Sequence, residues 1–319
     1  MGISGNYRVL KLRTAALAAL LAISTACGDA SSSGRKGAPP SGTATTEYLS
    51  PEITGKIETP EVEESSGLAA SLCQPDVLWT HNDAGDGPYL YAISTEGKHL
   101  GTWKVRDADN DDWEDIDEFK DAAGKCYIFI GDIGNNKEDR NELTIYSVAE
   151  PVISAGGASS NSKQPLETVP AESFKFKYPD KPNNAETMMV HPTTRDIYVL
   201  TKREKGASGI YKLKPAFGST VVAEKVGELS VPSFPVGLLT GGAISPNGRR
   251  VVLCDYQSGY ELVLPDGESN FDSIWRQQLT VVNLGKRRQG EAITYGADGN
   301  AIYATSENKN PPLTKVSRR

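Results

Sequence analysis

A unit of three or four short strand-like runs recurs five times after residue 60, and this repetition limits the possible folds more than any single motif does. Each unit has a small-residue or apolar first run, then β-branched or aromatic runs separated by turn residues. The first runs begin near residues 66, 114, 186, 242 and 291. This spacing is typical of four-stranded propeller blades, which repeat every roughly 40–50 residues, with a Gly/Ser-rich insert at 155–165 in the longest interval.

The last unit lacks a fourth strand, and segment 53–58, which precedes the first unit, has the same strand character. Pairing of this segment with the last unit closes a ring and leaves no open sheet edge. We therefore predict an all-β fold, a single β-propeller of five four-stranded blades closed by an N-terminal strand. Six blades are the alternative, and a β-sandwich is the simpler competitor, although it does not explain why every second strand ends on a polar residue.

The N-terminal segment has the pattern of an export signal. Basic residues Arg8, Lys11 and Arg13 precede a short apolar run at 15–23, which is too short to span a bilayer. The run ends at Ser24-Thr25-Ala26-Cys27, which resembles the bacterial lipobox, where the cysteine is lipidated. The sequence predicts a lipoprotein-type signal peptide at 1–26, lipidation of Cys27, a flexible Gly/Ser/Pro tether at 27–50 and the propeller at 51–319. An ordinary secretory signal, giving a secreted or periplasmic protein, is the alternative.

The balance of acidic and basic residues limits the classes of partner that the protein can bind. The chain has 41 acidic and 34 basic residues and a formal net charge of −7, so it has no excess of cations for neutralising nucleic acid phosphates. We expect no nucleic acid partner, membrane contact only through the N-terminal lipid, and a monomer.

Three cysteines remain besides Cys27. Cys73 and Cys126 lie at corresponding positions of neighbouring units, so they are a candidate disulfide in an oxidising compartment, with two separate thiols as the alternative. Cys254 lies within an apolar strand, which favours a buried thiol over a nucleophile.

Acidic residues gather where the predicted strands begin and end. In a propeller, the starts of first strands and the ends of second strands lie at the same axial opening, so we expect carboxylates from several units to meet there. A hard cation with oxygen ligands, most simply Ca²⁺, would relieve their repulsion. The predicted metal ligands are Asp83, Asp107, Asp109, Asp111, Glu114, Asp132, Glu186 and Glu291. Solvated carboxylates that accept hydrogen bonds from backbone amides are the alternative.

One acidic loop has the spacing of a calcium-binding loop. Asp107, Asp109, Asp111 and Glu118 match the ligand positions, but Asp112 stands where such a loop requires glycine, and no helices are expected beside it. A solvated acidic loop explains the same residues.

Five motifs carry a family resemblance: 64–68 (ESSGL), 79–83 (WTHND), 112–116 (DWEDI), 131–136 (GDIGNN) and 201–203 (TKR). They resemble secreted bacterial β-propeller proteins that are mostly uncharacterised, and the group is more distantly similar to esterase-like phytase propellers. The resemblance spans about residues 60–310 and implies the propeller fold. The fourth unit departs from the pattern, because it has Gly241-Gly242-Ala243 where other later units have glutamate.

Two classes of function fit these observations. The first is a binding module that takes a small molecule or a protein on the loop-rich face, with Ca²⁺ stabilising the site. The second is a metal-dependent hydrolase of phosphate or carboxylate esters, with Glu186 as base and Lys202 and Arg203 holding the anion. No serine hydrolase or zinc protease motif occurs.

Overall fold

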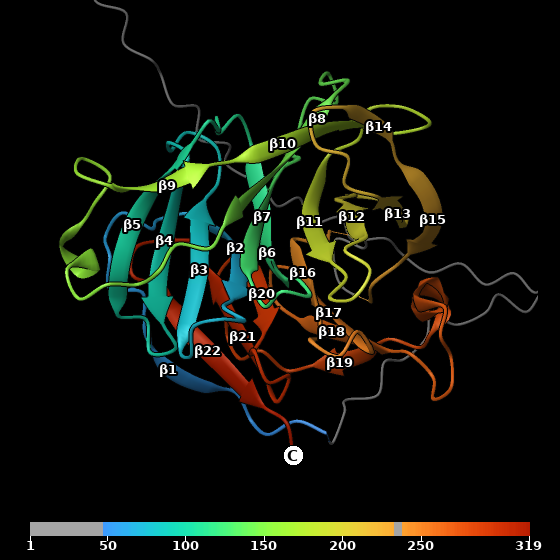
Figure 1. Ribbon diagram of the computed structural model, residues 1–319. Helices are drawn as coiled ribbons and strands as arrows, with labels where there is room; N and C mark the ends of the chain where they lie inside the picture. Colours follow the sequence, from blue (N-terminus) through green and yellow to red (C-terminus); the bar gives the residue numbers. More distant parts are fainter. Residues whose placement is uncertain (1–46, 233–237) are drawn as a thin grey trace, which may run out of the picture. The chain divides into compact units, whose positions relative to one another are not determined.

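The computed structural model describes residues 47–232 and 238–319, which form an all-β domain with five sheets arranged in a ring (Figure 1). The predicted five-bladed β-propeller is therefore confirmed. The predicted signal peptide, Cys27 and most of the tether lie outside the described residues. Within the described part, no helix has the length and apolar character needed to cross a membrane.

Each blade is built from four antiparallel strands in chain order from the axis outward, except that the chain start completes the last blade. Blade 1 contains β2 (Ser65–Ala70), β3 (Val77–Asn82), β4 (Tyr89–Ser94) and β5 (His99–Arg106). Blade 2 contains β6 (Trp113–Lys120), β7 (Cys126–Asp132), β8 (Leu143–Ala149) and β10 (Glu172–Lys177). Blade 3 contains β11 (Ala185–Val190), β12 (Ile197–Thr201), β13 (Ser208–Leu213) and β15 (Glu224–Leu229). Blade 4 contains β16 (Gly241–Ile244), β17 (Arg250–Cys254), β18 (Gly259–Val263) and β19 (Thr280–Val282), and blade 5 contains β20 (Gly290–Tyr295), β21 (Ala301–Ser306), β22 (Pro312–Ser317) and β1 (Glu52–Lys56).

Two blades carry a fifth, outermost strand that the sequence did not predict. β9 (Leu166–Pro170) pairs in parallel with β5, and β14 (Thr220–Val222) pairs in parallel with β10. Each of these strands belongs to a long connection within the following blade. This connection therefore covers the outer edge of the preceding blade. Two short 3₁₀ helices, η1 (Gly157–Ser159) and η2 (Phe271–Arg276), complete the described elements.

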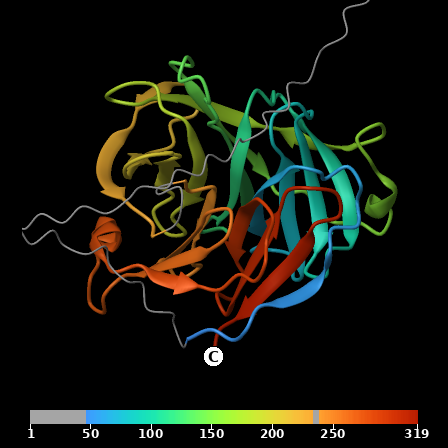
Figure 2. The same cartoon turned by 180° about the vertical axis from the view of Figure 1, so that it is seen from behind.

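The N-terminal strand closes the ring as predicted. β1 pairs antiparallel with β22, so the two ends of the domain lie side by side (Figure 2). The preceding segment adds a buried contact, because the Tyr48 hydroxyl donates a 2.6 Å hydrogen bond to Glu261 in blade 4. The same carboxylate accepts hydrogen bonds from Tyr295 (2.8 Å) and Arg250 (2.8 Å). The chain start therefore links blades 4 and 5 as well as completing the sheet.

The core is divided among the spaces between blades. Five buried apolar clusters each join side chains of two neighbouring blades. Between blades 1 and 2, for example, Trp79 and Trp113 are fully buried. Each fully buried large apolar side chain contributes roughly 1.5–3 kcal/mol, so a single blade cannot retain its core without its neighbours.

The inner strands β2, β6, β11, β16 and β20 surround the axis, and two carboxylates of β6 reach into it. Asp115 accepts hydrogen bonds from the backbone amides of Met188 (2.9 Å) and Gly242 (3.3 Å). Asp117 accepts one from Val190 (2.7 Å). Burial raises the pKa of Asp117 to about 7, although the backbone amides oppose this shift. Asp115 and Asp117 thus satisfy backbone groups that no neighbouring strand pairs.

A disulfide joins Cys73, which follows β2, to Cys126 at the start of β7. It links blades 1 and 2 at the end of the inner strands away from the predicted carboxylate opening. Cys254 is a buried thiol whose Sγ lies 3.2 Å from the backbone oxygen of Glu291.

The glycine at the start of β16 is required by packing. A Cβ atom on Gly241 would lie 2.2 Å from the backbone oxygen of Glu291 on β20, which is a backbone contact that no rotamer relieves.

We therefore expect Gly241→Ala to lower the free energy of unfolding by about 1–3 kcal/mol through overpacking, measured by urea denaturation. Gly156→Ala is the matched control, because Gly156 has φ −92° and no atom within 4 Å of the added Cβ. The control should stay within about 0.5 kcal/mol of the parent protein. Equal stabilities of the two variants would contradict this account of β16.

Candidate functional site

A repeated backbone irregularity brings oxygen-bearing side chains to one end of the axis. Four of the five inner strands have a one-residue register shift, located at Ser66, at Glu114, at Glu186 and, in β20, between Gly290 and Ile293, where Glu291 lies. β16 has no such shift. A β-bulge turns the side chain of the extra residue out of the regular alternation, and here it directs these four side chains to the axial mouth, the opening where the inner strands begin.

Three carboxylates form the acid cluster of this mouth. Asp83 follows the end of β3, while Asp112 and Glu114 lie at the start of β6, and oxygens of all three lie within 4.8 Å of one another. Among the described residues, one other group reaches this proximity, but two of its three members are the disulfide cysteines. The acid cluster is therefore the described group with the composition of a hard-cation site.

The acid cluster is half-buried, with Glu114 as its buried member, and its charges repel. Glu114 is only 2 % exposed. Burial, followed by repulsion from Glu186 and Asp83, raises the pKa of Glu114 well above its ordinary value. Burial and then Asp83 raise the pKa of Asp112 to about 6. These raised pKa values mean that full ionisation of the cluster is unfavourable in free energy. Protonation or a bound cation would reduce this penalty.

A supporting network fixes the loops that carry the acid cluster. Asp132 accepts a hydrogen bond from the backbone amide of Asp112 (3.2 Å) and forms an ion pair with Arg140 (2.8 Å). Arg140 also donates a 2.7 Å hydrogen bond to the backbone oxygen of Gly134. The missing side chain of Gly134 matters, because a Cβ there would lie 2.3 Å from Asp112 Oδ2 and 2.4 Å from Glu114 Oε1.

The opposite half of the mouth contains a cation of the protein itself. The Lys202 ammonium forms an ion pair with Glu186 and also donates a 3.0 Å hydrogen bond to the Tyr256 hydroxyl. Burial raises the pKa of Glu186 to about 7, although Lys202 opposes the shift. Burial, Glu186 and Glu307 together raise the pKa of Glu291 to about 10. Lys202 therefore neutralises one of these carboxylates, and Glu291 is held in its protonated form.

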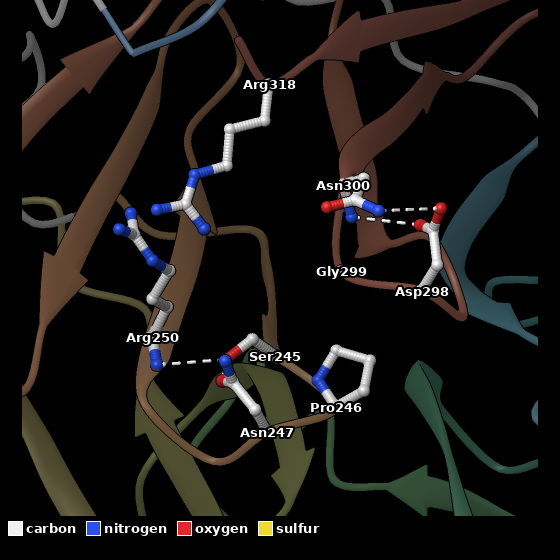
Figure 3. A pocket seen from close by; sticks show the side chains of 8 residues that line it. All are labelled: Ser245, Pro246, Asn247, Arg250, Asp298, Gly299, Asn300 and Arg318. Carbon is white, nitrogen blue, oxygen red and sulfur yellow. Dashed lines mark hydrogen bonds between the residues drawn. The ribbon is translucent and has the colours of Figure 1, made fainter.

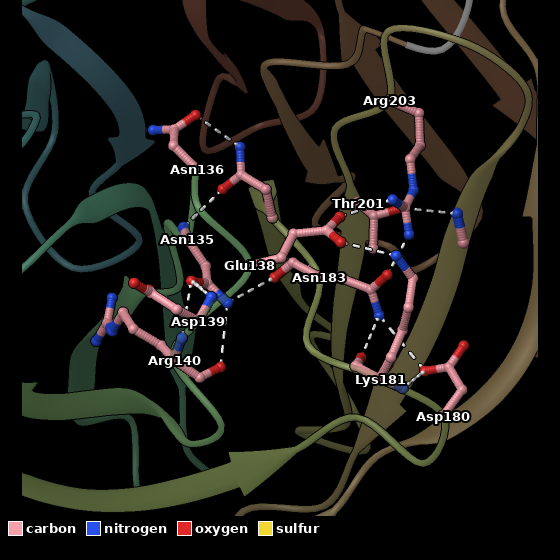
Figure 4. Close-up of polar contacts among 12 residues, drawn as sticks. Asn135, Asn136, Glu138, Asp139, Arg140, Asp180, Lys181, Asn183, Thr201 and Arg203 are labelled. Atoms are coloured by element: carbon pink, nitrogen blue, oxygen red, sulfur yellow. Dashed lines mark hydrogen bonds and ion pairs between the residues drawn. The ribbon is translucent and has the colours of Figure 1, made fainter.

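A cavity of about 1180 Å³, here called the mouth cavity, opens beside Lys202. Its lining is Asn136, Glu138, Asn184, Lys202, Arg203, Glu204, Lys205, Gly206, Leu238 and Tyr256. One wall is a polar network between blades 2 and 3, drawn in Figure 4. There Glu138 forms ion pairs with Lys181 (2.7 Å) and Arg203 (2.9 Å). Arg203 is thus partly committed to the wall, whereas Lys205 is exposed at the rim.

The predicted metal ligands do not all come together. Asp107, Asp109 and Asp111 are exposed on the loop before β6. Glu118 lies near the other end of β6 and accepts a 3.1 Å hydrogen bond from the backbone amide of Leu72. The residues with calcium-loop spacing therefore form no shared ligand group within the described part of the chain.

Two other polar residues, Asp255 and His81, support the strand ends. Asp255 accepts a 2.7 Å hydrogen bond from the Tyr260 hydroxyl and two from the backbone of its own turn. His81 is fully buried, packs edge-on against Trp113, and places Nδ1 2.9 Å from the backbone oxygen of Asn82. Burial lowers the pKa of His81, so its neutral form is favoured.

Sequence reasoning missed Asp112, Arg140 and Tyr256 as site residues. Asp112 belongs to the quoted DWEDI motif. It lies two residues before the predicted ligand Glu114, and this closeness in sequence could have indicated a shared site. Arg140 and Tyr256 lie in connecting loops, and only the folded ring brings them to the mouth.

Comparisons with known proteins identify no family and no function for this chain. No protein-family model and no curated protein sequence matches the chain. Two solved β-propeller structures resemble it. One is a chain of a nidogen/laminin complex, with 14 % identity, a TM-score of 0.41 and coverage of 77 % of this chain and 73 % of that chain. The other is a gluconolactonase from Xanthomonas campestris, with 13 % identity, a TM-score of 0.42 and coverage of 89 % and 99 %, respectively.

The buried Glu186 and Lys202 pair should make stability depend on pH in a predictable direction. In Lys202→Met, an unpaired Glu186 carboxylate would remain, which typically costs about 3–5 kcal/mol. Glu186 already has a folded pKa above its ordinary value, and loss of Lys202 raises it further. The loss of stability should therefore be largest at pH 8 and smaller at pH 5, where Glu186 is protonated.

Urea denaturation at both pH values measures this effect. Adding Glu186→Gln to the variant should restore stability at pH 8, whereas Lys225→Met, which breaks an exposed pair with Glu228, should change little. A pH-independent loss, or no recovery in the double variant, would refute the coupling.

Proposed function

We propose that the protein is a ligand-binding propeller whose axial mouth holds a Ca²⁺ ion and, next to it, a small anionic molecule. The observation that carries this proposal is the acid cluster, whose three carboxylates converge at the axial mouth, where Glu114 interacts electrostatically with Lys202 of the mouth cavity. We favour binding over catalysis, because a binding role accounts for each of these groups without assigning any of them as a nucleophile or a base.

The donor set of the acid cluster suits Ca²⁺. This ion takes about six to eight oxygen ligands, with carboxylates among them, and tolerates varied geometry. Asp83, Asp112 and Glu114 would supply protein oxygens, and the absent side chain of Gly134 leaves them room. Bound Ca²⁺ would offset the repulsion that raises the pKa values of Asp112 and Glu114.

The mouth cavity suits an anion with an apolar portion. Lys202, Arg203 and Lys205 line it together with Tyr256 and Leu238. Lys202 and Arg203 already have carboxylate partners, so Lys205 and the ion would supply the additional positive charge that attracts an anion. Ligand charge and the calcium charge would then support each other.

The proposal includes export and anchoring through a lipid on Cys27, supported by the signal-like segment and the lipobox-like ending. The protein would act as a monomer without nucleic acid. Fractionation of cells that express the parent chain or Cys27→Ser tests the anchor, since the variant should leave the membrane fraction.

Calcium should raise the melting temperature of the parent protein relative to the protein in excess EGTA. At a concentration one hundred times Kd, a ligand that binds only the folded state adds about 2.7 kcal/mol. Asp112→Asn and Glu114→Gln should lose the calcium shift because each removes one charge from the ligand set. Asp266→Asn, in an exposed loop, should retain it. A parent protein that melts identically in calcium and EGTA would disprove the proposed ion.

Ester hydrolysis is a second candidate, favoured by Glu186. Its carboxylate lies beside Lys202 at the mouth cavity, and a pKa of about 7 suits a general base. A bound divalent ion would supply Lewis acidity. Glu186 would take a proton from the attacking water, while Lys202 and Arg203 would hold the anionic group of a phosphate or carboxylate ester.

Assays with p-nitrophenyl phosphate and p-nitrophenyl acetate separate the two candidates. A hydrolase should show turnover that rises with pH through about 7 as Glu186 loses its proton, and Glu186→Gln should lower kcat by about 10²- to 10⁴-fold. Glu228→Gln is the matched control, because Glu228 is exposed on an outer strand. Calcium binding without turnover of either ester would leave the binding function and exclude hydrolysis of these substrates.

A further inference from the structure

A second polar pocket lies at the other end of the inner strands. The turn after β16 and the turn after β20 form it together with Arg318, whereas the axial mouth lies where these strands begin. Its volume is about 280 Å³. Figure 3 shows the guanidinium groups of Arg250 and Arg318 on one side and Asp298 with Asn300 on the other. We call it the base pocket.

Arg250 is held rigidly in place. Its guanidinium forms a 2.8 Å ion pair with Glu261, whose side chain is only 2 % exposed. Glu261 is in turn fixed by hydrogen bonds from Tyr48 and Tyr295. Because the guanidinium is already positioned, little conformational entropy is lost when it binds a further carboxylate.

The two arginines already bind a carboxylate of the protein. One oxygen of Glu47 lies 3.0 Å from Arg250 Nη1 and 3.5 Å from Arg318 Nη2. The Glu47 side chain is 51 % exposed, so this carboxylate can exchange with an external one at small cost. Both arginines therefore serve as a carboxylate site that an internal side chain occupies.

The opposite side of the base pocket has the opposite charge. Asp298 accepts hydrogen bonds from the backbone amide (2.9 Å) and side-chain amide (3.1 Å) of Asn300, which hold it in the turn. A carboxylate near the arginines and a cationic group near Asp298 would both be matched, whereas a second anionic group would be repelled by Asp298.

We propose that the base pocket binds a small zwitterion, with its carboxylate at Arg250 and Arg318 in place of Glu47 and its ammonium group toward Asp298. This assignment is independent of the axial mouth, because it uses no residue of the acid cluster or the mouth cavity.

Titration calorimetry with 4-aminobutyrate, at constant ionic strength, tests the proposal on the folded propeller. Glu47→Gln removes the internal competitor and should tighten binding by about two- to fivefold. Arg318→Gln should weaken it by at least about tenfold, since it removes a hydrogen bond between charged groups. Glu52→Gln, an exposed glutamate on β1, should leave affinity unchanged. Arg250 is avoided as a test position because its loss would leave Glu261 buried without its cation.

Two analogues test the orientation. Butyrate, which lacks the ammonium group, and succinate, which replaces it with a carboxylate, should bind more weakly than 4-aminobutyrate. Asp298→Asn should reduce the preference for 4-aminobutyrate over butyrate. Absence of binding to Glu47→Gln protein, affinity that is insensitive to Arg318→Gln, or succinate binding as tightly as 4-aminobutyrate would each overturn the proposal. Unchanged melting temperatures of the variants ensure that a loss of binding does not reflect unfolding.

Discussion

The whole arrangement depends on how a ring of inner strands satisfies the backbone groups that face its axis. An inner strand pairs with its blade on one side only, and buried amides without partners are costly. Asp115 and Asp117 of β6 solve this problem by accepting hydrogen bonds from β11 and, for Asp115, from β16. Two carboxylates of one strand thereby connect three blades. Both carboxylates are buried within the ring.

At the axial mouth, the balance of charge is the next constraint. Two carboxylates 4 Å apart repel by roughly 4 kcal/mol at an effective dielectric constant near 20. The mouth contains the acid cluster, Glu186 and Glu291, and in the described part of the chain Lys202 is the lysine whose ammonium lies among them. Protonation relieves part of this repulsion, as the raised pKa of Glu291 shows. A divalent ion would relieve the rest at neutral pH, which is why we link function to the acid cluster rather than to the exposed aspartates.

The sequence was informative about features that repeat and uninformative about features that occur once. Strand periodicity predicted the blades and their closure by β1, and the rule that strand starts and ends share one opening predicted that Glu114 and Glu186 lie close together. The same rule placed Asp132 there, but it could not foresee that Arg140 would engage it from a loop. Spacing alone suggested that Asp107 and Glu118 share a loop site. However, Asp107 precedes β6 and Glu118 lies near the far end of this extended strand, so the two side chains are far apart. The parallel strands β9 and β14 were missed because their pairing depends on contacts between blades.

The missing bulge in blade 4 explains where the mouth opens. β16 lacks the bulge of the other inner strands: Gly241 and Gly242 pair in unbroken register with β17, so no residue takes the place of Ser66, Glu114, Glu186 or Glu291. Since Gly241 packs against the backbone of β20, no side chain projects from blade 4 at this level. Tyr256, from the turn after β17, approaches Lys202 instead, and the mouth cavity extends from there over blade 3. A ligand in this cavity would therefore meet Lys202 and Tyr256 before the acid cluster. Fivefold repetition builds the mouth, and the missing bulge residue of blade 4 leaves the side on which a ligand can enter.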